Sequence, residues 1–353
     1  MLALNFAVLW ALLSPPSPSG QSISRHDFFV DSEPGIRLFV REVLADAPKQ
    51  NQPTAILFVH GARVPGLASF DLDGPGGSLA ADLAARGFVV YVMDVRGYGA
   101  SSRPPEMEQP PSAHPPLVRS NEAARDIGAV VDSICARRHV SRVALFGWAT
   151  GGQWAGYYAS LRPEKVSALI LLNSLYGGSS QHSMLGHGSS MQDPNHKDRF
   201  NQADCGAYRL NSVESLFGLW DRSIPSQNKA AWRDPAIAEA YARAALSSDP
   251  QSNSHVPPSF RSPCGALEDS FYLAIGRQLW DASFVTAPIL ILASERDFWS
   301  RPKDRQALAE AATRSPNVRT VVLPNATHFV HLDHPEHGRT RLLDEVSSFL
   351  SAP

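Results

Sequence analysis

Short apolar runs alternate with helical patterns along most of the chain, and no other feature of the sequence restricts its fold as strongly. Runs such as ALILL at 168–172 and PILILA at 288–293 are continuous, which is typical of strands covered on both faces. The pattern predicts strands at 28–30, 37–43, 55–59, 89–93, 143–146, 168–172, 289–292 and 320–323. It predicts helices at 77–86, 121–138, 152–161, 305–313 and 337–349. This order indicates an α/β fold with a mostly parallel central sheet flanked by helices.

The rhythm stops between residues 174 and 282, where Gly, Ser, Asn and Pro are frequent before amphipathic pieces at 213–220 and 235–246. A segment this long inside a compact domain is usually functional or has structure of its own. Because the sheet pattern resumes afterwards, we expect residues 21–173 and 283–353 to form one core. We expect 174–282 to form a mostly helical cap between the sixth and seventh strands, over the carboxyl edge where open α/β sheets bind ligands.

The first 20 residues differ from the rest of the chain. Residues 1–13 (MLALNFAVLWALL) carry no charge, and a Pro/Ser/Gly stretch follows at 14–20. The apolar run is too short to span a membrane and is typical of a secretory signal peptide, although no Lys or Arg precedes it. We therefore expect a secreted or periplasmic protein. The alternative is an apolar leader helix that packs on the domain or lies on a membrane surface.

The charge balance excludes some partners. Lys and Arg total 32 against 34 Asp and Glu, a formal net charge of −2. Such a balance gives no electrostatic footprint for nucleic acid or an anionic membrane, so we expect neither partner and no stable membrane span. The oligomeric state is left open.

The three cysteines are compatible with either an exported or an intracellular protein. Cys135 lies in a helical pattern and is expected to be a buried free thiol. Cys205 and Cys264 both fall in the 174–282 segment, and in an exported protein they could form a disulfide across it.

Five motifs follow predicted strands in a fixed order: FVHG at 58–61, DVRGYGAS at 94–101, FGWATGG at 146–152, SERD at 294–297 and ATHF at 326–329. Together they resemble the α/β-hydrolase superfamily, in particular its capped, serine-esterase-like branch. The resemblance extends from about Asp27 to the end of the chain and is weakest in the cap. It implies the α/β-hydrolase fold, with the cap inserted between strands 6 and 7.

The third motif has the form of a nucleophile elbow, a tight strand-to-helix turn that needs small neighbours, which Gly147, Gly151 and Gly152 supply. Its nucleophile position holds Ala149 where the family carries serine. His328 is the candidate general base, and Asp297 would accept its other ring N–H and hold the tautomer. Glu295 is an alternative acid, but the family pattern favours the later position.

The resemblance also implies an oxyanion hole. The backbone N–H groups of Ala62 and Thr150 would stabilise the developing oxyanion. Gly61, Trp148 and Trp299 flank the predicted catalytic positions and are the candidate substrate-binding residues.

Several other residues have simpler interpretations. His60 and Arg96 are expected to organise loops. The HxxHxxH spacing of His328, His331 and His334 could suggest a metal, but a zinc site needs three or four converging ligands. We expect no metal and no cofactor.

Ala149 has no atom that can attack a substrate, and three explanations remain open. The chain could be a Ser→Ala variant of a carboxylic ester hydrolase, silenced or nearly so. It could be a non-catalytic relative that binds a small molecule, or an enzyme in which His328 and Asp297 act alone as a general base, as in cofactor-independent dioxygenases of this fold. The first is favoured because every other part of the site is intact. The cap and its aromatic residues indicate a small, apolar or aromatic ester as the substrate.

Overall fold

The structure, a computed structural model, describes residues 22–46 and 54–352. The leader expected at 1–20 therefore lies outside the described residues. In the two described ranges, none of the helices has the length and apolarity needed to cross a membrane.

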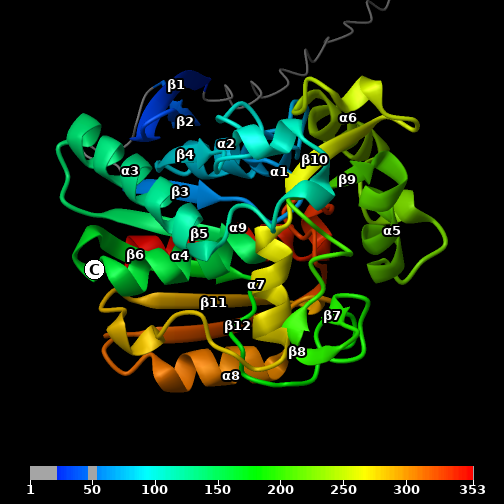
Figure 1. The fold of residues 1–353 in the computed structure, drawn as a ribbon. Coiled ribbons are helices and arrows are strands. Elements are labelled where there is room, and N and C mark those ends of the chain that lie inside the picture. Colours follow the sequence, from blue (N-terminus) through cyan, green and yellow to red (C-terminus); the bar gives the residue numbers. More distant parts are fainter. Residues whose placement is uncertain (1–21, 47–53, 353) are drawn as a thin grey trace, which may run out of the picture.

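An eight-stranded sheet forms the centre of the molecule, in the order β1-β2-β4-β3-β5-β6-β11-β12 (Figure 1). β1 pairs antiparallel with β2, β2 pairs antiparallel with β4, and all later neighbours are parallel. The strands are β1 (Ile23–Glu33), β2 (Ile36–Ala45), β3 (Ala55–Val59), β4 (Val89–Met93), β5 (Val143–Trp148), β6 (Val166–Leu172), β11 (Ile289–Arg296) and β12 (Val318–Thr327). The mostly parallel sheet expected from the apolar runs is thus confirmed.

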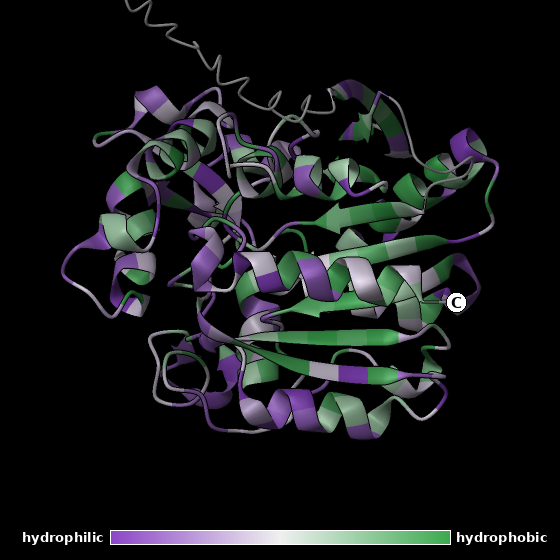
Figure 2. Cartoon of the chain, turned by 180° about the vertical axis from the view of Figure 1, so that it is seen from behind, coloured by the Kyte–Doolittle hydropathy of each residue, from purple (hydrophilic) through white to green (hydrophobic). Residues whose placement is uncertain are grey.

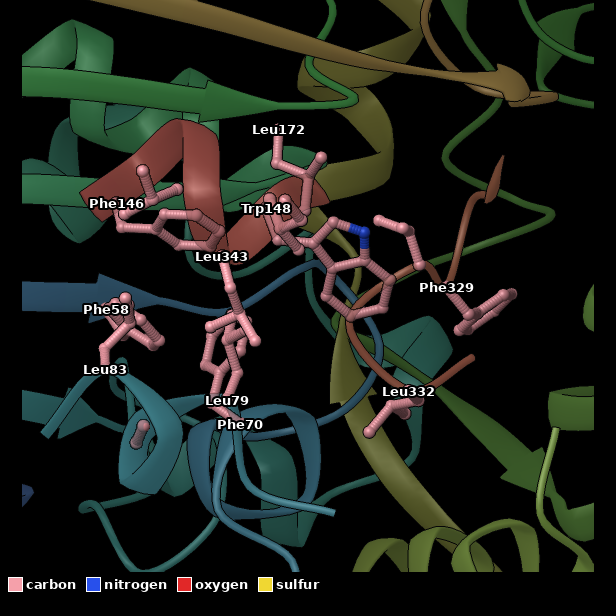
Figure 3. Close-up of a cluster of buried hydrophobic side chains, with 14 of the residues drawn as sticks. Phe58, Phe70, Leu79, Leu83, Phe146, Trp148, Leu172, Phe329, Leu332 and Leu343 are labelled. Carbon is pink, nitrogen blue, oxygen red and sulfur yellow. The ribbon is translucent and has the colours of Figure 1, made fainter. Parts of the chain in front are cut away.

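Side chains of neighbouring strand residues point to opposite faces, and each face carries its own apolar core. Phe58 belongs to the cluster that includes residues of α1 (Gly66–Phe70), α2 (Leu79–Ala85) and α9 (Arg339–Ser351), part of which Figure 3 shows. Leu57 belongs to the cluster on the other face, with residues of α3 (Ser120–Arg138), α4 (Thr150–Leu161) and α8 (Pro302–Ala311). The strands are mostly hydrophobic and the helices are mixed (Figure 2). The result is a three-layer α/β/α arrangement.

The segment 174–282 contains both helices and short strands. The two amphipathic pieces form α5 (Val213–Ser223) and α6 (Pro235–Ser247), and α7 (Gly265–Ala274) follows. Two small sheets, which the sequence pattern did not predict, pair β7 (Gln192–Asp193) with β8 (His196–Phe200) and β9 (Tyr208–Ser212) with β10 (Ser259–Pro263). Figure 1 shows α5, α6 and the β9–β10 pair gathered at the right of the view, beyond one end of the central strands.

A disulfide joins Cys205 and Cys264, whose Cα atoms lie 6.1 Å apart. The two cysteines lie at the end of the β9–β10 pair where Tyr208 is opposite Pro263. The bond therefore closes the insertion around these two strands. Cys135 is free but only partly buried, and burial raises the pKa of its thiol.

Short 3-10 helices complete the connections, at Pro105–Glu108, Pro111–Ala113, Pro163–Lys165, Lys229–Ala231, Ser252–Ser254, Ala282–Phe284 and Pro335–His337.

Candidate active site

The loops after β3, β5, β11 and β12 meet at the carboxyl edge of the sheet, because parallel strands end on the same side. A cavity of about 190 Å³ lies at this edge. Seven residues singled out from the sequence line it, namely Gly61, Ala62, Trp148, Ala149, Thr150, Trp299 and His328. The structure thus gathers these residues around one cavity, with Asp297 behind His328.

Ala149 occupies a sharp turn between β5 and α4, with φ 53° and ψ −116°. Its N–H donates to the carbonyl of Leu172 at 2.8 Å, which fixes the turn against β6. A non-glycine residue in such a conformation stores strain of about 1–3 kcal/mol. The turn therefore has the strained geometry of a nucleophile elbow although its side chain is only a methyl group.

The glycines around this turn are required by space. A Cβ on Gly151 would lie 2.1 Å from the carbonyl oxygen of Val59. A Cβ on Gly147 would lie 2.4 Å from the carbonyl oxygen of Gly151. Both obstacles are backbone atoms, so neither can move without displacing β3 or α4. The small neighbours expected from the sequence thus let α4 pack directly on the sheet.

His328 and Asp297 form a hydrogen-bonded pair. His328 Nδ1 lies 2.6 Å from Asp297 Oδ1, and the two side chains are 7% and 2% exposed. Arg296 at the end of β11 is opposite Thr327 at the end of β12, so the residues that follow them, Asp297 and His328, are brought side by side. Nδ1–H donates to the carboxylate, and within the described chain no group hydrogen-bonds to Nε2. This ring nitrogen is therefore left available to accept a proton.

Asp297 is held in place from its other side. Its carboxylate accepts hydrogen bonds from the N–H of Trp299 at 3.0 Å and from the N–H and hydroxyl of Ser300 at 2.8 and 2.5 Å. Glu295, the alternative acid, is exposed and accepts instead from the N–H of Asn325 at 2.6 Å. The geometry therefore pairs Asp297, rather than Glu295, with His328.

His60 joins the loop after β3 to the loop after β4. Its Nδ1–H donates to the carbonyl of Gly61 at 2.7 Å, and its Nε2 accepts from the N–H of Val95 at 3.1 Å. These two bonds need a neutral ring, and complete burial lowers its pKa to about 4. His60 thereby fixes the backbone that leads to Ala62, as the sequence analysis expected.

The loop after β4 is itself organised by buried charges. Asp94 accepts from the N–H of Gly66 at 2.7 Å and of Ala100 at 2.9 Å, and burial raises its pKa to about 6. Arg96 forms a buried ion pair with Asp126 at 2.6 Å. Arg96 thus holds the loop, as expected, and does not line the cavity.

The three histidines of the HxxHxxH spacing have different surroundings. His331 is buried against Trp148 with ring centroids 4.3 Å apart, and burial holds its pKa well below its usual value. His334 Nε2 donates to the carbonyl of Ala230 at 3.0 Å. Over residues 22–46 and 54–352, no group of three potential ligands converges on a metal position.

Aromatic rings surround His328. Trp148 donates its Nε1–H to the carbonyl of His328 at 3.1 Å, and Figure 3 shows its indole beside Phe329. Phe298 lies 4.6 Å from the imidazole and Trp299 lies 6.5 Å from it, between ring centroids. These rings fix the orientation of the imidazole and make its surroundings apolar.

Sequence reasoning missed much of the cavity lining, namely Arg63, Met184, Leu185, Met191, Arg209, Leu216, Leu219, Tyr241, Leu267, Phe298 and Phe329. Position next to a predicted site residue was a usable signal for Arg63, Phe298 and Phe329. The others belong to the 174–282 segment, whose path no local pattern indicated.

Comparisons with known proteins bear on the fold. A family model described as "alpha/beta hydrolase fold" matches residues 54–335. No curated protein matches the chain.

Many solved structures share the fold. The esterase RhEst1 from Rhodococcus sp. ECU1013 is 17% identical with a TM-score of 0.58, over 92% of this chain and 98% of that one. An esterase from Thermogutta terrifontis is 18% identical with a TM-score of 0.54, over 93% and 98%. A laboratory-evolved variant of potato epoxide hydrolase is 17% identical with a TM-score of 0.58, over 94% and 99%.

Proposed function

Since the chain belongs to the α/β-hydrolase fold family, we propose that its site is that of a carboxylic ester hydrolase, with alanine where the nucleophilic serine would stand. The observation that carries the proposal is the His328–Asp297 pair, at 2.6 Å, facing the same cavity as the strained turn at Ala149. An intact acid–base pair next to an elbow serves nucleophilic catalysis. Compared with that arrangement, the present site lacks the hydroxyl oxygen of a serine at position 149.

The chemistry would be a two-step acyl transfer. A serine at position 149 gives its proton to His328 Nε2 and attacks the ester carbonyl, while the N–H groups of Ala62 and Thr150 stabilise the oxyanion. His328 then protonates the leaving alcohol, and water attacks the acyl-enzyme to release the acid. Asp297 orients the imidazole and stabilises its cationic form.

The substrate is a small ester rather than a polymer. We propose that residues 174–282 act as a cap, because about half of the cavity-lining residues come from this segment. Most of the lining is apolar or aromatic, which favours an ester with an apolar or aromatic portion. Secretion is likewise proposed from the leader, and N-terminal sequencing of the protein recovered from the medium or periplasm tests it.

The direct test is the Ala149→Ser variant. We expect it to be labelled covalently by a fluorophosphonate, a probe that needs an activated serine but no knowledge of the substrate. Intact-mass measurement should show one adduct, absent from the unchanged chain and from the Ala149→Ser/His328→Ala double variant. The unlabelled Ala149→Ser variant should also hydrolyse aryl and alkyl esters, and labelling should abolish this activity.

The acid is tested in the same background. Asp297→Asn leaves the imidazole in the wrong tautomer and should lower kcat by about 10⁴-fold. Glu295→Gln removes a carboxylate two residues away that does not contact His328, so kcat should stay within a factor of two or three of the Ala149→Ser parent, by the usual scale of surface substitutions. Equal losses in the two variants would contradict the assignment of Asp297.

The same experiments separate the other interpretations. If the unchanged chain is already an active enzyme and His328→Ala abolishes that activity, His328 acts as a base without a nucleophile. If neither the unchanged chain nor the Ala149→Ser variant turns over esters while a metabolite binds tightly, the chain is a binding protein. Hydrolysis of epoxides by Ala149→Asp, without ester hydrolysis by Ala149→Ser, would assign an aspartate chemistry to the site.

A further inference from the structure

Two arginines, Arg63 and Arg209, line the same cavity as Ala149 and His328. The rest of the described lining contains no Asp or Glu. Arg63 donates from Nη1 to the backbone carbonyl of Ser215 at 2.8 Å, and the buried Nε of Arg209 has no hydrogen-bond partner in the described chain. The cavity therefore carries two positive charges that none of its own lining residues balances.

Other arginines of this chain show what a buried guanidinium normally receives. Four are at most 8% exposed, and each forms an ion pair with an aspartate at 2.6–2.8 Å, namely Arg96 with Asp126, Arg233 with Asp221, Arg261 with Asp249 and Arg339 with Asp82. Arg63 and Arg209 are only partly buried as whole residues, and they form no ion pair with any described residue. Because an uncompensated charge beside an apolar cavity is costly, their lack of a carboxylate indicates a counter-ion that arrives with a ligand.

The fold brings the two arginines together. Arg63 directly follows Ala62, the candidate oxyanion residue, and its carbonyl accepts from the hydroxyl of Ser262 at 2.7 Å. Ser262 is in turn the partner of Arg209 across the β9–β10 pair. The next residue along β9, Leu210, is 48% exposed. Strand alternation thus sends the leucine to solvent and the arginine to the cavity, the reverse of the usual preference.

The electrostatics agree with this placement. Burial and the positive charge of Arg63 lower the pKa of Arg209 to about 9. Burial also lowers the pKa of Arg63, and no carboxylate offsets either effect. Both guanidiniums stay charged at neutral pH and repel each other, so a bound anion would relieve the repulsion and the desolvation together.

On the basis of the ester hydrolase function proposed above, we propose that Arg63 and Arg209 form an anion subsite for a free carboxylate of the substrate. The substrate class is then the half-esters of short dicarboxylic acids. The esterified carboxyl lies at residue 149 and the oxyanion hole, and the free carboxylate is held by the two guanidiniums. Guanidinium groups suit this task because their N–H donors match the geometry of a carboxylate.

Binding to the unchanged chain tests the subsite without any turnover. Calorimetric titration with monoethyl glutarate and with diethyl glutarate compares ligands that differ in one charge. We expect the half-ester to bind about 10- to 100-fold more tightly, as for one or two charge-assisted hydrogen bonds. Arg209→Gln and Arg63→Gln should each lower the ratio of half-ester affinity to diester affinity by at least about ten-fold, with both affinities measured in the same variant.

Two further variants serve as controls. Arg243→Gln makes the same charge change on α6, where Arg243 is exposed and pairs with Glu239, and it should leave the preference intact. Arg209→Lys keeps the charge and should restore much of the preference that Arg209→Gln loses. Circular dichroism of each variant checks that it is folded.

The proposal is overturned if the two ligands bind equally, or if Arg209→Gln and Arg63→Gln behave like Arg243→Gln. Its outcome is separable from that of the proposed function. A half-ester that binds through the arginines but is not hydrolysed by Ala149→Ser supports the subsite and contradicts the ester hydrolase. Equal hydrolysis of half-ester and diester by Ala149→Ser supports the hydrolase and overturns the subsite.

Discussion

The turn at residue 149 keeps a strained backbone that an alanine does not need, and this leads to a stability prediction. Ala149 has φ 53° and ψ −116°, a region that glycine enters without steric cost. Ala149→Gly should therefore release strain that the parent chain stores. The methyl group lines the cavity, but Ala149 is only 6% exposed, so its removal also loses some apolar burial.

The magnitude follows from three contributions. Relief of the strained conformation stabilises the fold by about 1–3 kcal/mol. The greater chain entropy of glycine costs about 0.5–1 kcal/mol, and loss of the buried methyl group costs up to about 0.8 kcal/mol. The sum is a gain of about 1 kcal/mol in the free energy of unfolding.

Ala155→Gly is the matched control, because Ala155 is buried inside α4 and has no positive φ. It loses the same entropy and methyl burial without strain relief, so it should be destabilised by about 1.3–1.8 kcal/mol. Urea unfolding followed by tryptophan fluorescence measures both variants. If Ala149→Gly loses as much stability as Ala155→Gly, the turn is not strained and the reasoning fails.

Three further predictions concern the frame of the site. Gly151→Ala should lower the free energy of unfolding by about 3 kcal/mol or more, or prevent folding, because its Cβ would lie 2.1 Å from a backbone oxygen. Gly218→Ala is the control, since Gly218 has open space around it, and it should leave the melting temperature unchanged or raise it. His60 has its pKa lowered to about 4, so its contribution is full above pH 6.5 and is lost as the pH falls toward 4. Between pH 7 and pH 5 this loss amounts to about 2 kcal/mol of the free energy of unfolding. Urea titrations should show that the loss is absent from the His60→Gln variant. The parent chain must be compared with this variant at each pH, because the raised pKa of Asp94 changes the stability in the opposite direction. The Cys205–Cys264 disulfide joins residues that are 59 positions apart in the sequence, so its reduction should lower the free energy of unfolding by up to about 4 kcal/mol. A melting temperature that is the same with and without reductant would refute this.

The sheet and the hydrogen-bonded His328–Asp297 pair could be predicted because their signals are local. β3 and β4 have the bounds expected from the sequence, since each is a continuous apolar run that both faces of the sheet bury. Asp297 and His328 are far apart in sequence, but each directly follows a strand, and parallel strands end at one edge. Motif order and one geometric rule were therefore enough.

The part of the cavity lining that residues 174–282 contribute could not be predicted in the same way. Arg209 lies in YRLNS, a short polar stretch that becomes a strand only by pairing with β10 about fifty residues later. α1 is five residues long and has no apolar periodicity to reveal it. Such segments take their structure from tertiary contacts, here including the Cys205–Cys264 bond.

The backbone conformation of Ala149 also determines how small a genetic change would alter the site. Alanine and serine codons differ by a single base, and the backbone at this turn already has the conformation that a nucleophile requires. On the function proposed above, one base change would therefore restore the nucleophile, with no rebuilding of the surrounding protein.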